Sequence, residues 1–375
     1  MQLFDWLREK MLRNYNDTRD YIRVSGRRKA FRFFMRRGNL FLQIKDRLKW
    51  FLAPQFNYIV DFPTHLEVEV AASCQMRCPM CKREQMPKDK KQGLMDYELY
   101  KKIIDEAVQR EVFSVKLSWR GEPLLNPKIF EMIRYAKDKG IKDVAFLTNG
   151  ERLTPETSKK LIESGLDWMS ISVDGMGETY DRIRWPENFE GIVKKLRDFK
   201  ELRDKSGSKK PLIRIQTIWS AVKEDPDSYF RYFENIGDKV YVIADQQRSD
   251  LASFPRVPKY KCPMPWQRMA IGWNGLVMKC VCDYNEYEII GDARVQSLHE
   301  IWHGEKISKY REVIKSGGIY TLKSCATCND TGRMKDLEVQ ILGKPVRLSL
   351  YINQDIPVDK IEARPPKAVY EKTKG

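Results

Sequence analysis

Residues 65–81 read HLEVEVAASCQMRCPMC, a β-strand pattern followed at once by three cysteines. The strand is predicted at 65–72, and Cys74, Cys78 and Cys81 follow it with the spacing C-x3-C-x2-C. Three thiolates this close can bind three irons of a four-iron cluster and leave the fourth iron open to another ligand. Zinc is the alternative, but zinc prefers four ligands, and neither a histidine nor a fourth cysteine is adjacent.

Strand and helix patterns alternate from residue 63 to about residue 249. Strands are predicted at 65–72, 114–119, 143–148, 168–173, 212–218 and 239–244. Helices are predicted between them at 97–109, 128–139, 155–164, 189–205 and 228–236. Such a series predicts an α/β fold, a partial parallel (β/α)6 barrel over 63–249. Folds of this kind build their sites at the carboxyl ends of the strands.

The chain is strongly basic. Its 375 residues include 68 Lys and Arg against 52 Asp and Glu, a formal net charge of +16. This charge favours an anionic partner: nucleic acid, an anionic membrane or a phosphorylated substrate. Because the sequence has no long uncharged apolar run and no apolar stretch of the signal-peptide kind at its start, we expect a cytoplasmic protein. In that reducing compartment the eight cysteines are interpreted as metal ligands or catalytic groups.

Much of the basic charge lies near the start of the chain. The first fifty residues hold fourteen Lys or Arg and five Asp or Glu, interleaved with aromatic residues. Leu40, Ile44 and Leu48 have helical spacing, so 1–62 is predicted to be a basic amphipathic helical extension whose helix ends near Pro54. Either this extension packs on the main domain with a solvated basic face, or residues 1–52 dock on a membrane surface or a partner. Because no known nucleic-acid module accompanies the charge, no nucleic acid is expected.

Five further cysteines follow the point at which the strand and helix alternation stops. They are Cys262, Cys280, Cys282, Cys325 and Cys328. We expect a second, small cysteine-rich domain at 250–330 and a C-terminal tail at 331–375. Four thiolates can hold either an iron–sulfur cluster or a structural zinc ion, and both remain open for this set.

Taken in order, these motifs resemble radical S-adenosylmethionine (radical SAM) enzymes over about residues 65–330. The resemblance rests on the first three cysteines and on short motifs that follow the next three predicted strands, Gly121-Glu122-Pro123, Thr148-Asn149-Gly150 and Ser172-Val173-Asp174-Gly175. It implies a [4Fe–4S] cluster on Cys74, Cys78 and Cys81, whose open iron binds SAM. One electron from the cluster then cleaves SAM to methionine and a 5′-deoxyadenosyl radical, which abstracts a hydrogen atom from the substrate.

The resemblance also implies which residues contact SAM. They are Gly121, Glu122, Pro123, Asn149, Ser172, Asp174, Arg214 and Gln216, together with Met80 in the cysteine loop. In the family the Gly-Glu-Pro segment binds the SAM amino group, and the Glu122 carboxylate suits an ammonium partner. Arg120 departs from the family, which commonly has glycine there. Tyr180, Arg182 and Arg184 follow the ribose motif, either as a structural loop or as substrate or SAM contacts.

From Cys262 onward the chain resembles the SPASM/twitch extension of this family. The resemblance implies that Cys262, Cys280, Cys325 and Cys328 bind one auxiliary [4Fe–4S] cluster, with zinc as the alternative. Cys282 is then left over. It is either a small buried residue or alternate ligand, or a thiol that donates a hydrogen atom to the substrate radical, as in some radical SAM epimerases.

Two functions of different classes are consistent with these features. The first is an oxidoreductase or epimerase that acts on a small polar substrate of the sugar or aminocyclitol class, with phosphate- or lipid-linked forms suited to the basic chain. The alternative is a maturase that modifies a ribosomally made peptide. Either would need a one-electron donor such as flavodoxin or ferredoxin. His65, His299 and His303 are interpreted as structural or exposed.

Overall fold

The computed structural model describes residues 40–243, 257, 259–326, 328 and 334–351. A sheet of nine strands, in the order β6-β5-β4-β3-β2-β1-β7-β8-β9, runs through these residues. Neighbouring strands from β6 to β7 are parallel, whereas β7, β8 and β9 pair antiparallel. The strands are β1 His65–Val68, β2 Ser114–Lys116, β3 Asp143–Thr148, β4 Trp168–Ser172, β5 Leu212–Ile218, β6 Lys239–Ile243, β7 Arg268–Ile271, β8 Leu276–Met278 and β9 Ile289–Asp292.

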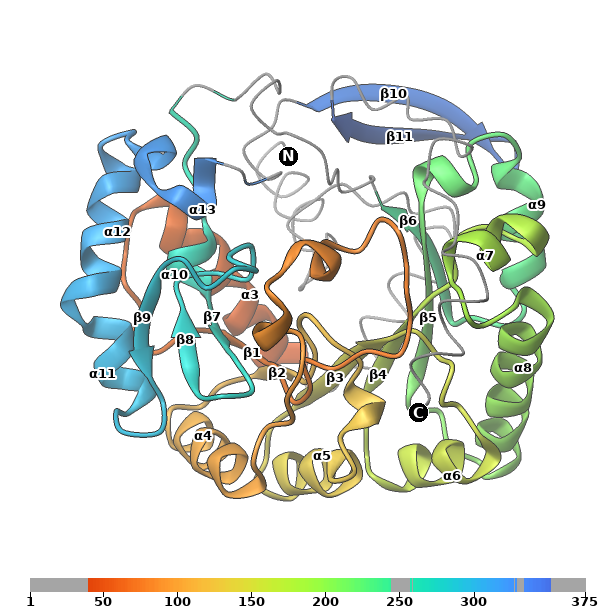
Figure 1. Ribbon diagram of the computed structural model, residues 1–375, viewed down its shortest axis with the longest axis horizontal. Helices are drawn as coiled ribbons and strands as arrows, with labels where there is room; N and C mark the ends of the chain where they lie inside the picture. The colour runs from red at the N-terminus through yellow and green to blue at the C-terminus, as the bar shows by residue number, and fades with distance from the viewer. Residues whose placement is uncertain (1–39, 244–256, 258, 327, 329–333, 352–375) are drawn as a thin grey trace.

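Helices cover the outer face of this sheet, and Figure 1 shows α4, α5, α6 and α8 around the rim with the strands inside. The helices are α3 Leu40–Gln55, α4 Tyr97–Gln109, α5 Ile129–Asp138, α6 Pro155–Glu163, α7 Gly177–Ile183, α8 Phe189–Lys205, α9 Pro226–Phe233, α10 Met264–Gln267, α11 Leu298–His303, α12 Glu305–Lys315 and α13 Lys323–Ala326. Side-chain caps fix several starts; the Asp96 carboxylate, for example, accepts from Glu98 N and Leu99 N at 2.9 and 3.0 Å. The predicted α/β partial barrel is confirmed, with strand and helix bounds within a few residues of those expected.

The strands separate an apolar outer layer from an interior that holds many polar side chains and a small apolar cluster of Ala145, Trp168 and Leu212. Leu66 and Val68 of β1 belong to the main hydrophobic core, together with residues of the surrounding helices. The alternate positions, His65 and Glu67, are buried but polar. Because side chains alternate across a strand, one face of β1 packs on helices and the other lines the barrel. The same alternation recurs on the neighbouring strands; in β5 it places Arg214 inside.

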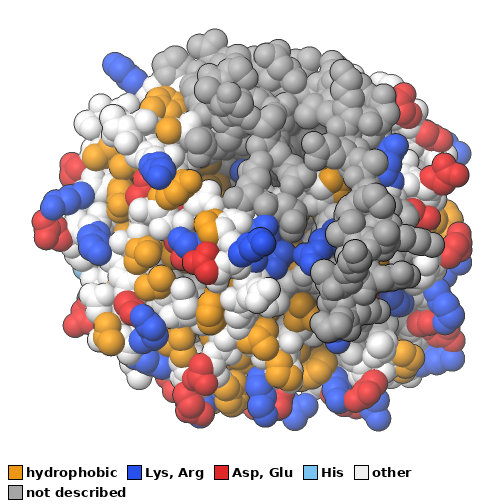
Figure 2. Space-filling view, viewed as in Figure 1, with side chains coloured by type: hydrophobic (Ala, Val, Ile, Leu, Met, Phe, Trp, Pro, Cys, Tyr) orange, Lys and Arg blue, Asp and Glu red, His pale blue; other side chains and the backbone are white. Residues whose placement is uncertain are grey.

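The outward face carries ordinary surface charge. Basic and acidic side chains are interspersed around the lower rim in Figure 2, where helices α4 to α6 lie. Many of them are paired with near neighbours, as Lys160 is with Glu156 at 2.6 Å and Lys139 is with Asp105 at 2.8 Å. Such exposed pairs contribute little to stability, so the fold depends on the layers beneath them.

The cysteine-rich segment continues the barrel sheet. Strand β7 pairs parallel with β1, with Leu66 opposite Met269, and the β8–β9 hairpin extends the sheet beyond it. The sequence predicts a second domain at 250–330 for this segment. In the structure Trp266, Met269 and Ile301 belong to the same hydrophobic core as the barrel.

Helix α3 buries three polar residues alongside Trp50 and Ala53, which departs from the amphipathic pattern expected for the 1–62 extension. Gln43, Asp46 and Arg47 are buried, whereas Phe41 is 73% exposed. Helix α3 lies by the first residues of β1 and β7. There the Trp50 ring packs 4.6 Å from the Arg268 guanidinium. The rest of the predicted extension, residues 1–39, lies outside the described residues.

The segment predicted to be a C-terminal tail contains a β-hairpin. Strands β10 Met334–Ile341 and β11 Lys344–Tyr351 pair antiparallel through a two-residue turn at Leu342 and Gly343. Both turn residues have positive φ, 51° and 67°, as this type of tight hairpin requires. Leucine is an unusual residue in that conformation, so this turn is hard to recognise from the sequence. Residues 352–375 lie outside the described residues.

A buried ion cluster joins the barrel to the β8–β9 region. Arg120, just after β2, donates to both oxygens of Glu69 and at 2.7 Å to Glu286 Oε1, and its side chain has no exposed surface. Lys90 lies 3.4 Å from the other oxygen of Glu286, so two cations balance two carboxylates. Charges taken out of water are tolerated only in such paired arrangements.

We predict that Arg120→Met lowers the free energy of unfolding by about 3–5 kcal/mol, because it leaves two buried carboxylates with too little positive charge. Urea unfolding followed by tryptophan fluorescence under anaerobic conditions measures this loss. Arg231→Met is the control, because Arg231 forms only an exposed pair with Asp227 and should cost about 1 kcal/mol or less. Equal losses for the two variants would contradict the assignment.

Candidate functional site

A cavity of about 290 Å³ opens at the carboxyl ends of the parallel strands. Its walls combine the loop after β1 with residues at the ends of β2 to β6. The predicted site residues that line it are Cys74, Cys78, Met80, Cys81, Gly121, Glu122, Asn149, Ser172 and Gln216. These residues span more than 140 positions of sequence, so the fold brings together most of the proposed SAM contacts and the first cysteine set.

The three cysteines of the loop after β1 share this cavity. Cys81 N donates to Cys78 O at 3.0 Å, which closes the loop into a turn. Two side chains direct N–H groups at the sulfurs: Asn149 Nδ2 lies 3.8 Å from Cys74 Sγ, and Arg184 Nη1 lies 3.6 Å from Cys78 Sγ. Donors aimed at sulfur suit thiolates rather than neutral thiols, so this set fits an iron–sulfur cluster.

Burial dominates the electrostatics of these sulfurs. It raises the pKa of Cys74 to about 12, with a further contribution from the nearby Glu122 carboxylate. It raises the pKa of Cys78 to about 11, partly offset by Arg184. A bound cation is what keeps such buried sulfurs deprotonated at neutral pH, because the ion replaces the lost solvation of the thiolates.

The Gly-Glu-Pro segment packs tightly against the start of the cysteine loop. A Cβ on Gly121 would lie 2.3 Å from Ala71 O and 2.6 Å from Ser73 O, so only glycine fits without movement of the backbone. Glu122 N donates to Ser73 O at 2.8 Å. Gly121 therefore allows the loop after β2 to brace the residue before Cys74. Pro123 is buried at the start of a short 3-10 turn and does not line the cavity.

Glu122 connects the loops after β2 and β3. Its carboxylate accepts from Thr148 Oγ1 at 2.7 Å, from Asn149 N at 2.8 Å and from Leu124 N at 3.1 Å. Burial outweighs these donors and raises the pKa of Glu122 to about 7. A carboxylate in this state changes charge near neutrality, and a cationic ligand in the cavity would favour its ionised form.

Asp174 and Arg184 form a unit on one wall. Arg184 Nε donates to Asp174 Oδ2 at 2.7 Å, and Asp174 Oδ1 accepts from Ile218 N at 3.0 Å. Asp174 is 1% exposed and is not among the residues that line the cavity. Arg184 lines it instead, between Asp174 and Cys78. The sequence alone leaves both a structural and a binding role open for Arg184, because its distance from Cys78 depends on the fold.

Two proposed SAM contacts on β5 have different positions. Gln216 lines the cavity, and its Oε1 accepts from Tyr241 Oη at 2.6 Å. Arg214 lies deeper in the barrel, with its guanidinium 4.4 Å from the Trp168 ring and 4.7 Å from the Tyr241 ring. Since Arg214 does not line the cavity, its placement supports a packing role inside the barrel rather than a contact with a ligand.

The second cysteine set gathers around the β7–β8 hairpin and α13. Cys280 forms a side-chain hydrogen bond with Cys282, which together with burial raises the pKa of Cys280 well above its usual value. Burial raises the pKa of Cys262 to about 12, and Cys325 and Cys282 both add to this rise. Cys328 N donates to Cys325 O at 3.2 Å across the C-x2-C turn.

A buried cation accompanies this set. Lys279 Nζ donates to Cys325 Sγ at 2.9 Å and lies 3.6 Å from Glu288 Oε2. A lysine in this position is suited to a centre that carries the net negative charge of several thiolates, which an iron–sulfur cluster or a tetrathiolate zinc ion would have. Cys282 lies within the same group as Cys280, so the geometry does not single out one of them as the ligand.

The two cysteine sets are physically connected. Trp119 Nε1 donates to Val281 O at 2.8 Å, and Arg120 Nη1 donates to Tyr284 O at 3.1 Å. Trp119, Arg120 and Tyr284 also line the cavity. The turn that carries Cys280 and Cys282 therefore forms part of the support of the cavity wall.

Comparisons with known proteins agree with this arrangement. The family model of the radical SAM superfamily matches residues 68–209, and that of the SPASM iron–sulfur cluster-binding domain matches residues 262–329. The tungsten-containing aldehyde ferredoxin oxidoreductase cofactor-modifying protein of Pyrococcus furiosus is 24% identical over 71% of this chain and 87% of its own length. The AdoMet-dependent heme synthase of Methanosarcina barkeri is 34% identical, but over only 43% of this chain and 48% of its own length.

Solved structures show the same fold at lower identity. BtrN in complex with AdoMet and 2-DOIA matches 72% of this chain and 93% of its own, with a TM-score of 0.50 and 19% identity. Streptococcus suis SuiB bound to S-adenosylmethionine matches 73% of this chain and 71% of its own, with a TM-score of 0.54 and 15% identity. The cofactors that follow from the two matched domains are a [4Fe–4S] cluster, SAM and auxiliary iron–sulfur centres. The chain belongs to the radical SAM superfamily and carries a C-terminal SPASM domain.

Proposed function

We propose that this enzyme abstracts a hydrogen atom from a small polar substrate of the sugar or aminocyclitol class, and that the product is an oxidised alcohol or an inverted carbon. The observation that carries the proposal is the hydrogen-bonded contact between Trp119 and Val281. It places a turn with two cysteines, Cys280 and Cys282, against the wall of the cavity. A redox-active centre beside the cavity suits chemistry in which a substrate radical must lose an electron or regain a hydrogen atom.

Each cysteine set is proposed to bind a different iron–sulfur cluster. Cys74, Cys78 and Cys81 are the proposed ligands of the cluster that binds SAM. The proposed auxiliary ligands are Cys262, Cys280, Cys325 and Cys328. When bound, SAM and its cluster supply a hydrogen-abstracting radical, and the auxiliary cluster supplies a one-electron acceptor.

The remaining residues of the cavity wall are proposed to bind and orient SAM and its cluster. Glu122, when ionised, offers a carboxylate oxygen to the ammonium group of SAM. Arg184 is held by Asp174 and donates to Cys78 Sγ, so it stabilises the thiolate form of that ligand. The Gln216 side chain accepts a hydrogen bond from Tyr241 Oη and presents its amide to the same cavity. Met80, Gly121, Asn149 and Ser172 complete the proposed SAM contacts. Asp174 acts through Arg184 in this proposal.

Oxidation and epimerisation differ in what Cys282 does. An oxidised alcohol loses one hydrogen atom, one proton and one electron in total, and none of these requires a protein thiol. An inverted carbon must receive a hydrogen atom on the face opposite to the one it lost. Cys282 is partly exposed and lies next to the proposed ligand Cys280, so it is the thiol we propose for that donation if the reaction is an epimerisation.

A peptide substrate is the alternative. SuiB has also been solved bound to its precursor peptide SuiA, and the mycofactocin maturase MftC of Mycobacterium tuberculosis is 32% identical over 39% of this chain. With either class of substrate, the proposed cluster on Cys74, Cys78 and Cys81 would receive its electron from a one-electron donor of the flavodoxin or ferredoxin type.

We also propose that residues 1–52 bring the enzyme to an anionic membrane surface, where a phosphate- or lipid-linked substrate would be found. Helix α3 leaves Phe41, Leu48 and Leu52 exposed on one side, with Lys45 and Lys49 exposed among them. Apolar side chains mixed with lysines suit an anionic bilayer. No helix in the described part of the chain is long and apolar enough to cross a membrane.

Cys282→Ala tests the proposed chemistry directly. For an epimerase, we expect product to be lost while SAM cleavage continues, because the substrate radical still forms but receives no hydrogen atom. For a dehydrogenase, we expect product to persist. Product formation and 5′-deoxyadenosine are measured by mass spectrometry after anaerobic reconstitution, with deuterium incorporation from heavy water as a second readout.

Iron content keeps this test interpretable. Wild type and Cys282→Ala should each hold about eight irons per chain, and Cys74→Ala/Cys78→Ala/Cys81→Ala should hold about four. A loss of about four irons from Cys282→Ala would instead make Cys282 an auxiliary ligand. If wild-type protein holds only about four irons, it lacks the auxiliary electron acceptor. The oxidation reaction would then be ruled out.

The raised pKa of Glu122, about 7, predicts pH-dependent SAM binding. The ionised carboxylate is the form that binds an ammonium group, so the dissociation constant should rise as pH falls through 7, about tenfold between about pH 8 and about pH 6. Isothermal titration of SAM into reconstituted protein measures this change. Glu122→Gln should bind weakly with a flat profile relative to the exposed control Glu156→Gln, and an unchanged profile in Glu122→Gln would rule out this carboxylate as the titrating group.

Membrane binding is predicted to depend on the exposed side of α3. Phe41→Ser/Leu48→Ser/Leu52→Ser should lose most co-sedimentation with phosphatidylglycerol vesicles, whereas Val295→Ser, which alters an exposed apolar residue after β9, should keep it. Wild-type binding should weaken with salt and be low on phosphatidylcholine. Equal sedimentation of the triple variant and wild type would exclude α3 as the contact.

A further inference from the structure

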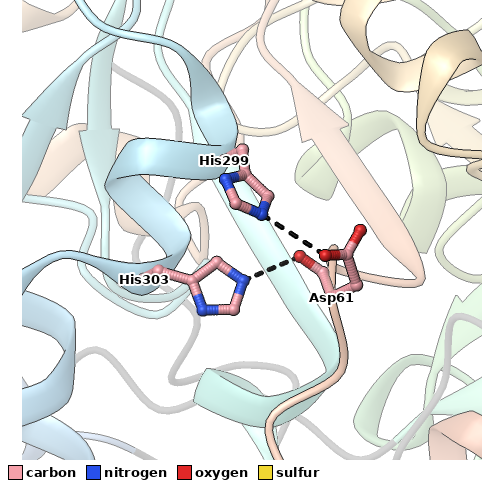
Figure 3. A group of neighbouring side chains, drawn as sticks. All are labelled: Asp61, His299 and His303. Carbon is pink, nitrogen blue, oxygen red and sulfur yellow. Dashed lines mark hydrogen bonds and ion pairs between the residues drawn. The ribbon is translucent and has the colours of Figure 1, made fainter.

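Two histidines and an aspartate meet on the side of the molecule where the SPASM region contacts the segment before β1. His299 and His303 lie on α11, and Asp61 lies between α3 and β1 (Figure 3). One ligand atom from each of the three residues lies within 4.8 Å of the others. The sequence spacing of the histidines is i, i+4, which puts both rings on one face of the helix. This group shares no residue with the cavity or with the cysteine sets.

We propose that Asp61, His299 and His303 bind a divalent first-row transition ion, with Zn²⁺ as the expected occupant. Two imidazole nitrogens and one carboxylate oxygen are ligands that Zn²⁺ accepts, and water completes a four-coordinate shell. The side chains are accessible to an ion from solvent: Asp61 is 71% exposed and His299 is 32% exposed.

The backbone holds these ligands near one another before any ion binds. Glu106 of α4 accepts from Leu298 N and His299 N, both at 2.8 Å, and so fixes the start of α11. Trp302 Nε1 donates to Val60 O at 2.8 Å, which fixes the residue beside Asp61 against the same helix. The Trp302 contact is buried, and the Glu106 contacts are partly buried. An ion at this site therefore does not have to order the chain segments that supply its ligands.

The two carboxylate oxygens of Asp61 have different neighbours. Oδ1 lies 3.4 Å from His299 Nε2, and Oδ2 lies 3.3 Å from Arg110 Nη1. Oδ1 is therefore the oxygen placed for the ion, while Arg110 orients the carboxylate from behind, as outer-shell partners of metal ligands commonly do. His303 Nε2 contacts Asp61 O at 2.8 Å (Figure 3), and a ring rotation would exchange that contact for the ion.

An ion here would join α11 to the chain just before the first barrel strand. That junction shares no residue with the cavity and uses ligands unlike the cysteine sets. Its effect is therefore expected on stability rather than on the hydrogen abstraction itself. Binding to the folded state alone raises the melting temperature in proportion to the logarithm of the free ion concentration.

The test uses anaerobically reconstituted protein, so that the cysteines are already occupied by iron. Equilibrium dialysis against micromolar Zn²⁺, followed by elemental analysis, should show about one zinc per chain in wild type. His299→Asn/His303→Asn and Asp61→Asn should lose this zinc while they retain the wild-type iron content and circular dichroism. Glu305→Gln, an exposed carboxylate at the start of α12, is the matched control and should retain the zinc.

Two further readouts separate this site from the thiolates. Zn²⁺ should raise the melting temperature of wild type and of Glu305→Gln but not that of the His299→Asn/His303→Asn variant. Bound Co²⁺ should lack the intense near-ultraviolet absorption of cobalt–thiolate bonds. The proposal is overturned if reconstituted wild type binds no zinc, if the histidine variant binds as much zinc as wild type, or if the cobalt spectrum shows thiolate ligands.

Discussion

The buried contact of Arg120 with Glu69 and Glu286 is the constraint on which the site depends. It ties three segments that are far apart in sequence: the end of β1, the loop after β2 and the segment between β8 and β9. A charged guanidinium removed from water must keep both partners, because the loss of either leaves an unpaired charge in a medium that solvates it poorly. Residues next to Arg120, namely Gly121 and Glu122, are thereby held against the cysteine loop. The glycine common in relatives at this position could not make this connection.

Buried ion pairs also connect neighbouring strands in the interior of the barrel. Glu67 is paired with Lys116 and Arg268, which belong to the two strands that flank β1. These pairs bring together the parallel sheet and the first strand of the SPASM region. Helix α3 lies at this end of the sheet, where its Trp50 ring packs on the Arg268 guanidinium.

Features that depend on local pattern were predictable from the sequence, and features that depend on distant pairing were not. The bounds of β3, β5, α4 and α8 were predicted to the residue, because their apolar periodicity and flanking caps are local signals. The cysteines and the motif residues around the cavity were recognisable from their spacing and order. From the sequence, Arg120 is recognisable only as a departure from the family pattern, because nothing near it in the sequence indicates that Glu286 is its partner. The same holds for Arg184 and Asp61. The role of each depends on a partner more than 100 positions away, which is Cys78 for Arg184 and His299 for Asp61.

The connection between the two cysteine sets limits the chemistry that the enzyme can perform. The Cys280–Cys282 turn is held by Trp119 and Arg120, which are themselves residues of the cavity wall. The separation of the two sets is thus fixed by the protein, and a substrate does not have to bring them together. In the proposed function, a radical formed in this cavity would have a centre for electron or hydrogen-atom transfer held nearby. Because that centre is supported by a buried ion cluster and by the continuation of the barrel sheet, a perturbation of the SPASM region should reach the SAM site through Arg120 and Glu122 rather than through the substrate.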